Sequence, residues 1–71
     1  MNASQRQQIL ELLGRLSELA PDVRFGQLIA NLSYRAVAPT AEAIWDMEDE
    51  QLLTAIKDQI SDLSDRAANV G

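Results

Sequence analysis

Apolar residues recur along the chain at intervals of three and four positions, in three stretches that are separated by proline-containing breaks. Side chains with this spacing fall on one face of an α-helix, so the pattern predicts amphipathic helices at about residues 4–20, 22–36 and 48–67. No stretch alternates between apolar and polar residues as a half-buried strand does. We therefore expect residues 1–71 to form a single all-α domain, a small three-helix bundle.

Each predicted helix turns one stripe of apolar side chains toward a shared core. The stripes consist of Ile9, Leu12, Leu13, Leu16, Leu19 and Ala20; of Phe25, Leu28, Ile29, Leu32 and Ala36; and of Leu52, Leu53, Ile56, Ile60, Leu63 and Ala67. A chain near this length buries only about 60% of the surface that its unfolded form exposes, so such a core is marginal. This favours association, and we expect a homodimer with a helix-on-helix interface.

Two breaks define the connections between the predicted helices. Pro21 cannot continue a helix and disfavours helical geometry at the residue before it, so the chain reverses there. Pro39 and Thr40 break the helical pattern again, and we expect a short extra helical turn through Ile44 and Trp45 before the third helix begins. The indole of Trp45 is expected to pack as a lid over the end of the small core.

The residues after the first reversal predict a structural corner. The carboxylate of Asp22 is placed to cap the second helix, and Phe25 begins its apolar stripe. Arg24 falls in the first helical turn, where the helix dipole disfavours a cation. We therefore expect its guanidinium to bridge carboxylates at the acidic start of the third helix, with Asp46 and Asp49 as the partners.

A second row of residues lies on another side of the middle helix. Gly26, Ala30 and Tyr34 follow each other at four-residue spacing, and Val37 lies close by. One interpretation is a second internal seam, because the middle helix of three packs on both sides. The other is a partner-binding face, and it is our first choice for the seam of the homodimer. Gly26 also leaves room for a neighbouring backbone or for Trp45 at the corner.

Composition narrows the chemistry that the chain can perform. The sequence contains no cysteine and no histidine, which removes the thiol nucleophile, the thiolate metal ligand and the usual general base near neutral pH. Catalysis would have to rest on carboxylates alone, so we expect neither enzymatic activity nor a cofactor. The net charge of −5 and the lack of a basic face argue against nucleic-acid binding. No apolar run approaches the ~18 residues of a membrane span, and no secretion signal opens the chain, which favours a cytoplasmic protein without membrane contact.

Charge is unevenly placed along the chain. Residues 1–41 carry four arginines and three acids, whereas residues 42–65 carry eight acids and one lysine. The run WDMEDE at 45–50 is not followed by the central glycine and the final glutamate of an EF-hand loop, so we expect no metal site and assign these acids to the start of a helix. The acidic segment either keeps the chain soluble and pairs with its own arginines or attracts a basic partner.

The runs PDVRFGQL at 21–28 and WDMEDEQLL at 45–53 resemble those of a group of short, uncharacterised bacterial proteins. That group shares a P-D-x-R-x-G-Q-L helix start and a later aromatic-x-x-E-D-E-x-L helix start. The resemblance covers roughly residues 21–56, with a longer loop here and with Trp45 where the group tends to have Phe or Tyr. It implies a helical fold and no particular activity.

These observations favour a non-enzymatic protein–protein interaction module that serves as a small accessory or regulatory subunit. Two alternatives stay open. One is an acidic inhibitor or antitoxin that neutralises a basic partner, and the other is a homo-oligomeric structural module.

Overall fold

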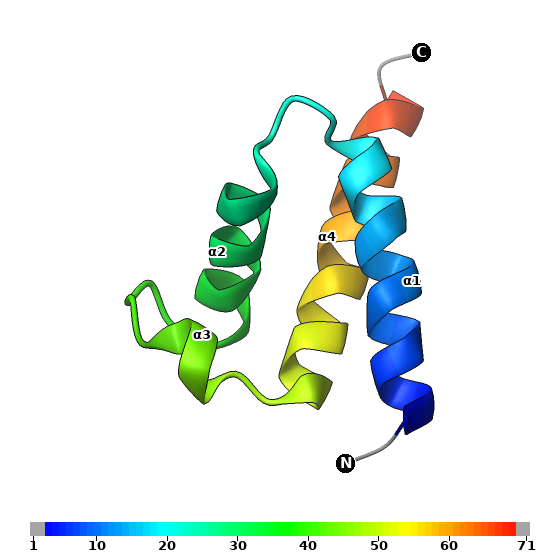
Figure 1. The fold of residues 1–71 in the computed structure, drawn as a ribbon. Coiled ribbons are helices and arrows are strands. Elements are labelled where there is room, and N and C mark those ends of the chain that lie inside the picture. Colours follow the sequence, from blue (N-terminus) through cyan, green and yellow to red (C-terminus); the bar gives the residue numbers. More distant parts are fainter. Residues whose placement is uncertain (1–2, 70–71) are drawn as a thin grey trace.

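The chain folds into three long helices and one short helix, in an up-down-up order (Figure 1). This computed structural model describes residues 3–69, with side chains described for residues 3–66. The helices are α1 (Ala3–Leu19), α2 (Phe25–Ala36), α3 (Ala43–Asp46) and α4 (Asp49–Asn69). The predicted all-α bundle is thereby confirmed, together with the extra helical turn between the second and third long helices.

The connection between α1 and α2 begins at Pro21, but α2 starts later than the sequence suggested. The backbone N–H of Val23 bonds to the carbonyl oxygen of Ala20 over 3.2 Å, which closes a turn around Pro21 and Asp22. This extra turn moves the N-cap position to Arg24, whose backbone is extended and whose side chain makes no capping hydrogen bond. The expected cap by Asp22 is therefore wrong, because the turn holds that residue two positions ahead of the cap.

The start of α4 is built as the sequence predicted. The carbonyl oxygen of Glu48 accepts the N–H of Leu52 over 3.0 Å, which places Glu48 at the N-cap position. The side-chain Oε1 of Gln51 accepts the backbone N–H of Glu48 over 2.8 Å, which is one half of a capping box. Asp49 and Glu50 lie in the first turn, where their charge complements the helix dipole.

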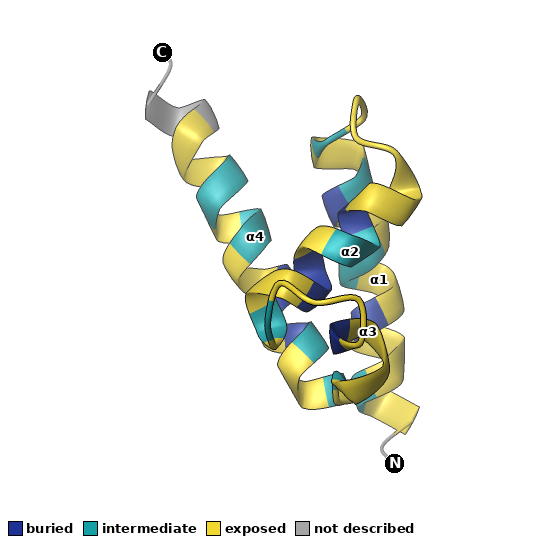
Figure 2. Ribbon diagram, turned by 90° about the vertical axis from the view of Figure 1, so that its left-hand side faces the viewer, coloured by how far each residue is buried: buried dark blue, intermediate teal, exposed yellow. Residues whose placement is uncertain are grey.

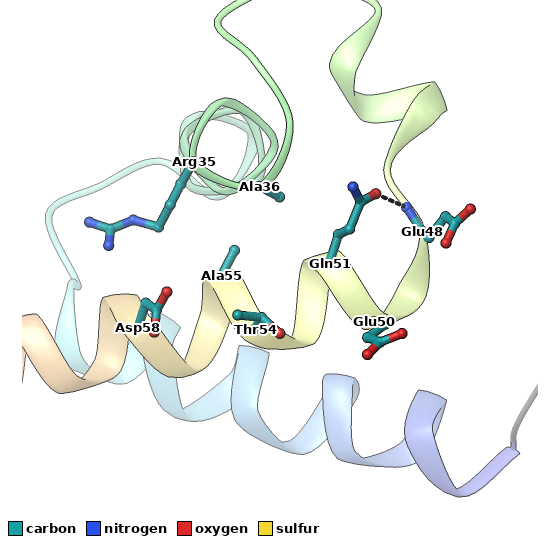
Figure 3. A pocket seen from close by; sticks show the side chains of 8 residues that line it. All are labelled: Arg35, Ala36, Glu48, Glu50, Gln51, Thr54, Ala55 and Asp58. Atoms are coloured by element: carbon teal, nitrogen blue, oxygen red, sulfur yellow. Dashed lines mark hydrogen bonds between the residues drawn. The ribbon is translucent and has the colours of Figure 1, made fainter.

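α4 is the element that packs against both α1 and α2, while α3 packs against α2. The core consists of Ile9, Leu16, Leu28, Leu32, Leu53, Ala55 and Ile56. The helical stripes predicted most of these residues, but they did not predict Ala55. Its methyl group faces Ala36 between α2 and α4 (Figure 3), and the two small side chains allow these helices to approach each other. The side chain of Ala67, which the pattern also assigned to the core, lies outside the described part of the chain.

The two outermost members of the predicted stripes do not reach the core. Leu19 is exposed at the end of α1, and Phe25 is 54% exposed at the start of α2. Figure 2 shows the reason, because α4 inclines away from α2 toward its C-terminal end. The radius of gyration, 12.3 Å, accordingly exceeds the ~11 Å expected for a compact chain of this length.

The bundle is closed at its other end by α3 rather than by the tryptophan. Ala43 on α3 is fully buried, and so is Ser33 on the facing helix α2. The hydroxyl of Ser33 donates to the carbonyl oxygen of Ala30 over 2.7 Å, so its burial leaves no polar atom unsatisfied. Trp45 instead points to solvent with 90% of its surface exposed, so the expectation that it covers the core is wrong. At this end of the bundle the buried side chain of α3 is Ala43 and not Trp45.

Candidate functional site

The most exposed large apolar side chain of the described chain belongs to Trp45 on α3. Ile44, the residue before it, is also exposed, and so are Tyr34 and Val37 at the end of α2, against which α3 packs. We call these four residues the α3 patch. Single exposed apolar side chains are common on protein surfaces, but a tryptophan exposed to this degree gives up most of the free energy that its burial would contribute. The α3 patch is therefore the first candidate for a binding surface.

The small-residue row of α2 is open to solvent. A Cβ atom added to Gly26 would meet no atom within 4 Å, Ala30 is half-buried, and Tyr34 is exposed. The row is thus not a second internal seam, and no neighbouring backbone or indole approaches Gly26. That the row binds a partner stays a prediction.

The predicted corner does not come together, because its members lie at opposite ends of the bundle. Arg24 precedes α2 at the end where α1 and α2 connect, whereas Asp46 and Asp49 lie at the end where α3 leads into α4 (Figure 1). The twelve residues of α2 span about 18 Å between the two ends. Arg24 accordingly forms no ion pair with any described residue.

The arginine that forms an ion pair among the described residues is Arg35, and the sequence did not predict this pair. Its Nη2 lies 3.0 Å from Oδ2 of Asp62 and ties the last turn of α2 to the middle of α4. Both side chains are more than a third exposed, so the pair is screened by solvent and contributes at most about 1 kcal/mol. The contact depends on how α2 lies against α4 in space, because the two residues are 27 positions apart along the chain.

A hollow of about 400 Å³ lies between the end of α2 and the beginning of α4, beside this ion pair (Figure 3). Its floor is formed by Ala36 and Ala55, and its rim carries Glu48, Glu50 and Asp58. The three carboxylates point in different directions, away from any common centre (Figure 3). In agreement, no three acidic side chains of the described residues are grouped in a way that could hold a metal ion.

A second hollow, of about 210 Å³, lies where α4 inclines away from α2, under the α1–α2 connection. We call it the apolar hollow, because most of the residues that line it are apolar, namely Ala20, Val23, Leu28, Leu32 and Leu63. The polar residues Asn31, Gln59 and Arg66 also line it. The apolar pattern does not predict this hollow, since Leu28 and Leu63 belong to stripes that were expected to pack in a filled core.

Among residues 3–66 there is no buried side-chain oxygen or nitrogen atom without a hydrogen-bond partner. No helix among the described residues is both long and apolar enough to cross a membrane. Comparison of the chain with protein-family models, with curated proteins and with solved structures finds no match.

Proposed function

We propose that this chain is a non-enzymatic protein–protein interaction module that docks through the α3 patch, as a small accessory or regulatory subunit. The observation that carries the proposal is the 90% exposure of Trp45 on a helix of only four residues. Tryptophan is the side chain most enriched among the residues that dominate binding energy at protein interfaces. Ile44 and Val37 supply further apolar area beside it.

A position-specific photo-crosslink tests this proposal in the cells that produce the protein. Trp45 is replaced by a photoreactive benzoylphenylalanine, and a matched variant carries the same group at Leu10, which is 65% exposed on α1. We expect discrete crosslinked adducts from position 45 and none of the same mass from position 10. The same adducts from both positions would show that the α3 patch has no docking role.

A second candidate function is an acidic inhibitor or antitoxin, and one observation favours it. Of the acids between residues 42 and 65, Asp62 is the one that forms an ion pair within the described part of the chain. The remaining charge is available to a basic partner. Crosslink yield or affinity that falls steeply between low and physiological salt would support this function, because exposed charges are screened over about 8 Å at physiological ionic strength.

A further inference from the structure

The chain carries an exposed apolar side chain and an apolar cavity that fit each other. Trp45 projects from α3, and the apolar hollow of about 210 Å³ opens between α2 and α4. A cavity of about 150 Å³ accommodates a benzene ring, so the hollow is large enough for most of an indole. Trp45 does not line the hollow of its own chain, because it lies beyond the C-terminal end of α2, whereas the hollow extends along the chain from Ala20 to Leu32 on this side.

The chemistry around each feature is also complementary. The residue that follows Trp45 is Asp46, and the residue that closes the hollow on α4 is Arg66. Both are exposed, and neither forms an ion pair with a described residue. An indole in the hollow would bring Asp46 to the side of Arg66, and the amide oxygen of Asn31 would be available to the indole N–H.

The placement of the two features suits a two-fold axis. α3 follows the C-terminal end of α2, whereas the hollow lies beside the part of the chain from Val23 to Leu32. A two-fold axis that crosses α2 between the hollow and α3 would set two α2 helices antiparallel and bring each α3 toward the hollow of the other copy. The two contacts are then identical, as such symmetry requires. α2 contains no acidic residue, so the two α2 helices would meet without repulsion between carboxylates of their own.

We propose that the occupant of the apolar hollow is a second copy of this chain, in a homodimer in which Trp45 of each copy inserts between α2 and α4 of the other. The proposal rests on the docking role proposed for the α3 patch and identifies its partner. It moves the expected seam of the homodimer from the Gly26 row to α3 and the hollow.

Sedimentation equilibrium and fluorescence of the purified full chain test self-association directly. We expect a species of twice the monomer mass at tens of micromolar, and Trp45 emission that shifts to longer wavelength as dilution returns the indole to water. Trp45 is the one tryptophan of the sequence, so the emission reports this site alone. Trp45→Ala should weaken dimerisation at least about 30-fold, as removal of a dominant interface residue does. The control Leu10→Ala removes an exposed apolar side chain of α1 and should leave dimerisation unchanged.

A mixing experiment separates this geometry from other dimers. Val23→Glu places a carboxylate in the hollow at an exposed position, so that variant keeps its indole but loses its hollow. Trp45→Ala keeps its hollow and contributes no tryptophan emission. Adding an excess of Trp45→Ala chain to Val23→Glu chain should shift the emission to shorter wavelength, because the remaining Trp45 enters an intact hollow. Arg66→Glu serves as a second hollow variant, and its dimerisation should be restored by Asp46→Arg in the same chain.

Three results would overturn the proposal: a folded chain that stays monomeric at a hundred micromolar, a dimer whose emission does not change on dilution, or no shift on mixing. Each of them leaves the docking role of the α3 patch to be judged by the crosslink at position 45, since a different partner would still yield adducts there.

Discussion

Arg24 and Arg35 lie at the two ends of α2, and their surroundings differ. Arg24 is exposed and forms no ion pair with a described residue, whereas Arg35 lies 3.0 Å from Asp62. We therefore expect Arg24→Ala to change the free energy of unfolding by less than about 0.5 kcal/mol. Arg35→Ala should lower it by up to about 1 kcal/mol.

Urea unfolding at one fixed, low protein concentration measures both effects, because self-association would add to the apparent stability. A double-mutant cycle with Asp62→Asn should give a coupling of about 0.2–1 kcal/mol for Arg35 and none for Arg24. A loss of 2 kcal/mol or more (about the cost of a buried charge pair) in Arg24→Ala would restore the corner that the sequence suggested.

The difference between these two arginines shows what a sequence can and cannot reveal at this scale. The helix dipole argument assumed that Arg24 lies in the first turn of the helix, whereas the structure places it at the N-cap position. The choice of a partner required knowledge of which helix ends meet in space. Because α2 runs against α4, the start of α2 lies at the far end from the acidic start of α4 (Figure 1). Local chemistry alone therefore paired the wrong residues.

At the scale of one element, the start of α4 is stabilised by a hydrogen bond from the backbone N–H of Glu48 to the side chain of Gln51. Gln51→Ala removes the acceptor of the Glu48 N–H and should lower the free energy of unfolding by about 0.5–1 kcal/mol. Gln51→Glu keeps an acceptor at the same distance and should cost little. Urea unfolding of the two variants checks this, and equal losses would show that the bond to Glu48 contributes nothing.

α1 contains a glycine that its conformation does not require. Gly14 lies in the middle of α1 without a positive φ angle, and an added Cβ would meet no atom within 4 Å. Gly14→Ala should therefore raise the free energy of unfolding by about 0.5–1 kcal/mol, because alanine restricts the unfolded chain and favours the helix. Thermal unfolding followed by circular dichroism measures the change. Lower stability in this variant would mean that another surface covers Gly14 in solution.

Apolar periodicity predicted the three long helices to within three residues at each described boundary, because a buried helix face repeats with the helix itself. It failed where burial depends on the angle between helices. Phe25 and Leu63 follow the stripe of their helices, yet Phe25 is exposed and Leu63 borders a hollow, because α4 diverges from α2 there (Figure 2). Ala55 shows the opposite case, since its burial comes from its contact with α2 and not from an apolar stripe.

At the scale of the whole molecule, the carboxylates of the described acidic segment do not converge on a common point, as the ligands of a cation must. The carboxylates of Glu48, Glu50 and Asp58 point apart around the larger hollow (Figure 3). Millimolar calcium or magnesium should raise the melting temperature by no more than sodium chloride of equal ionic strength, since both then act by screening alone. Calorimetry checks this. A saturable rise specific to calcium, lost in Glu48→Gln, would reveal a binding site.

The pairing of α1 with α4 also has a consequence for how the chain folds. α2, α3 and α4 follow one another closely along the chain, whereas α1 must pack on α4 across the whole of residues 20–48. Closing the longer loop costs more chain entropy, so we expect α2, α3 and α4 to assemble first and α1 to join last. By the same order, α1 should open first in the native state, and hydrogen exchange should find its amides less protected than those around Ile56. A transient opening of α1 uncovers the face of α4 against which it packs, which makes the detachment of this one helix the step that exposes the chain to proteolysis.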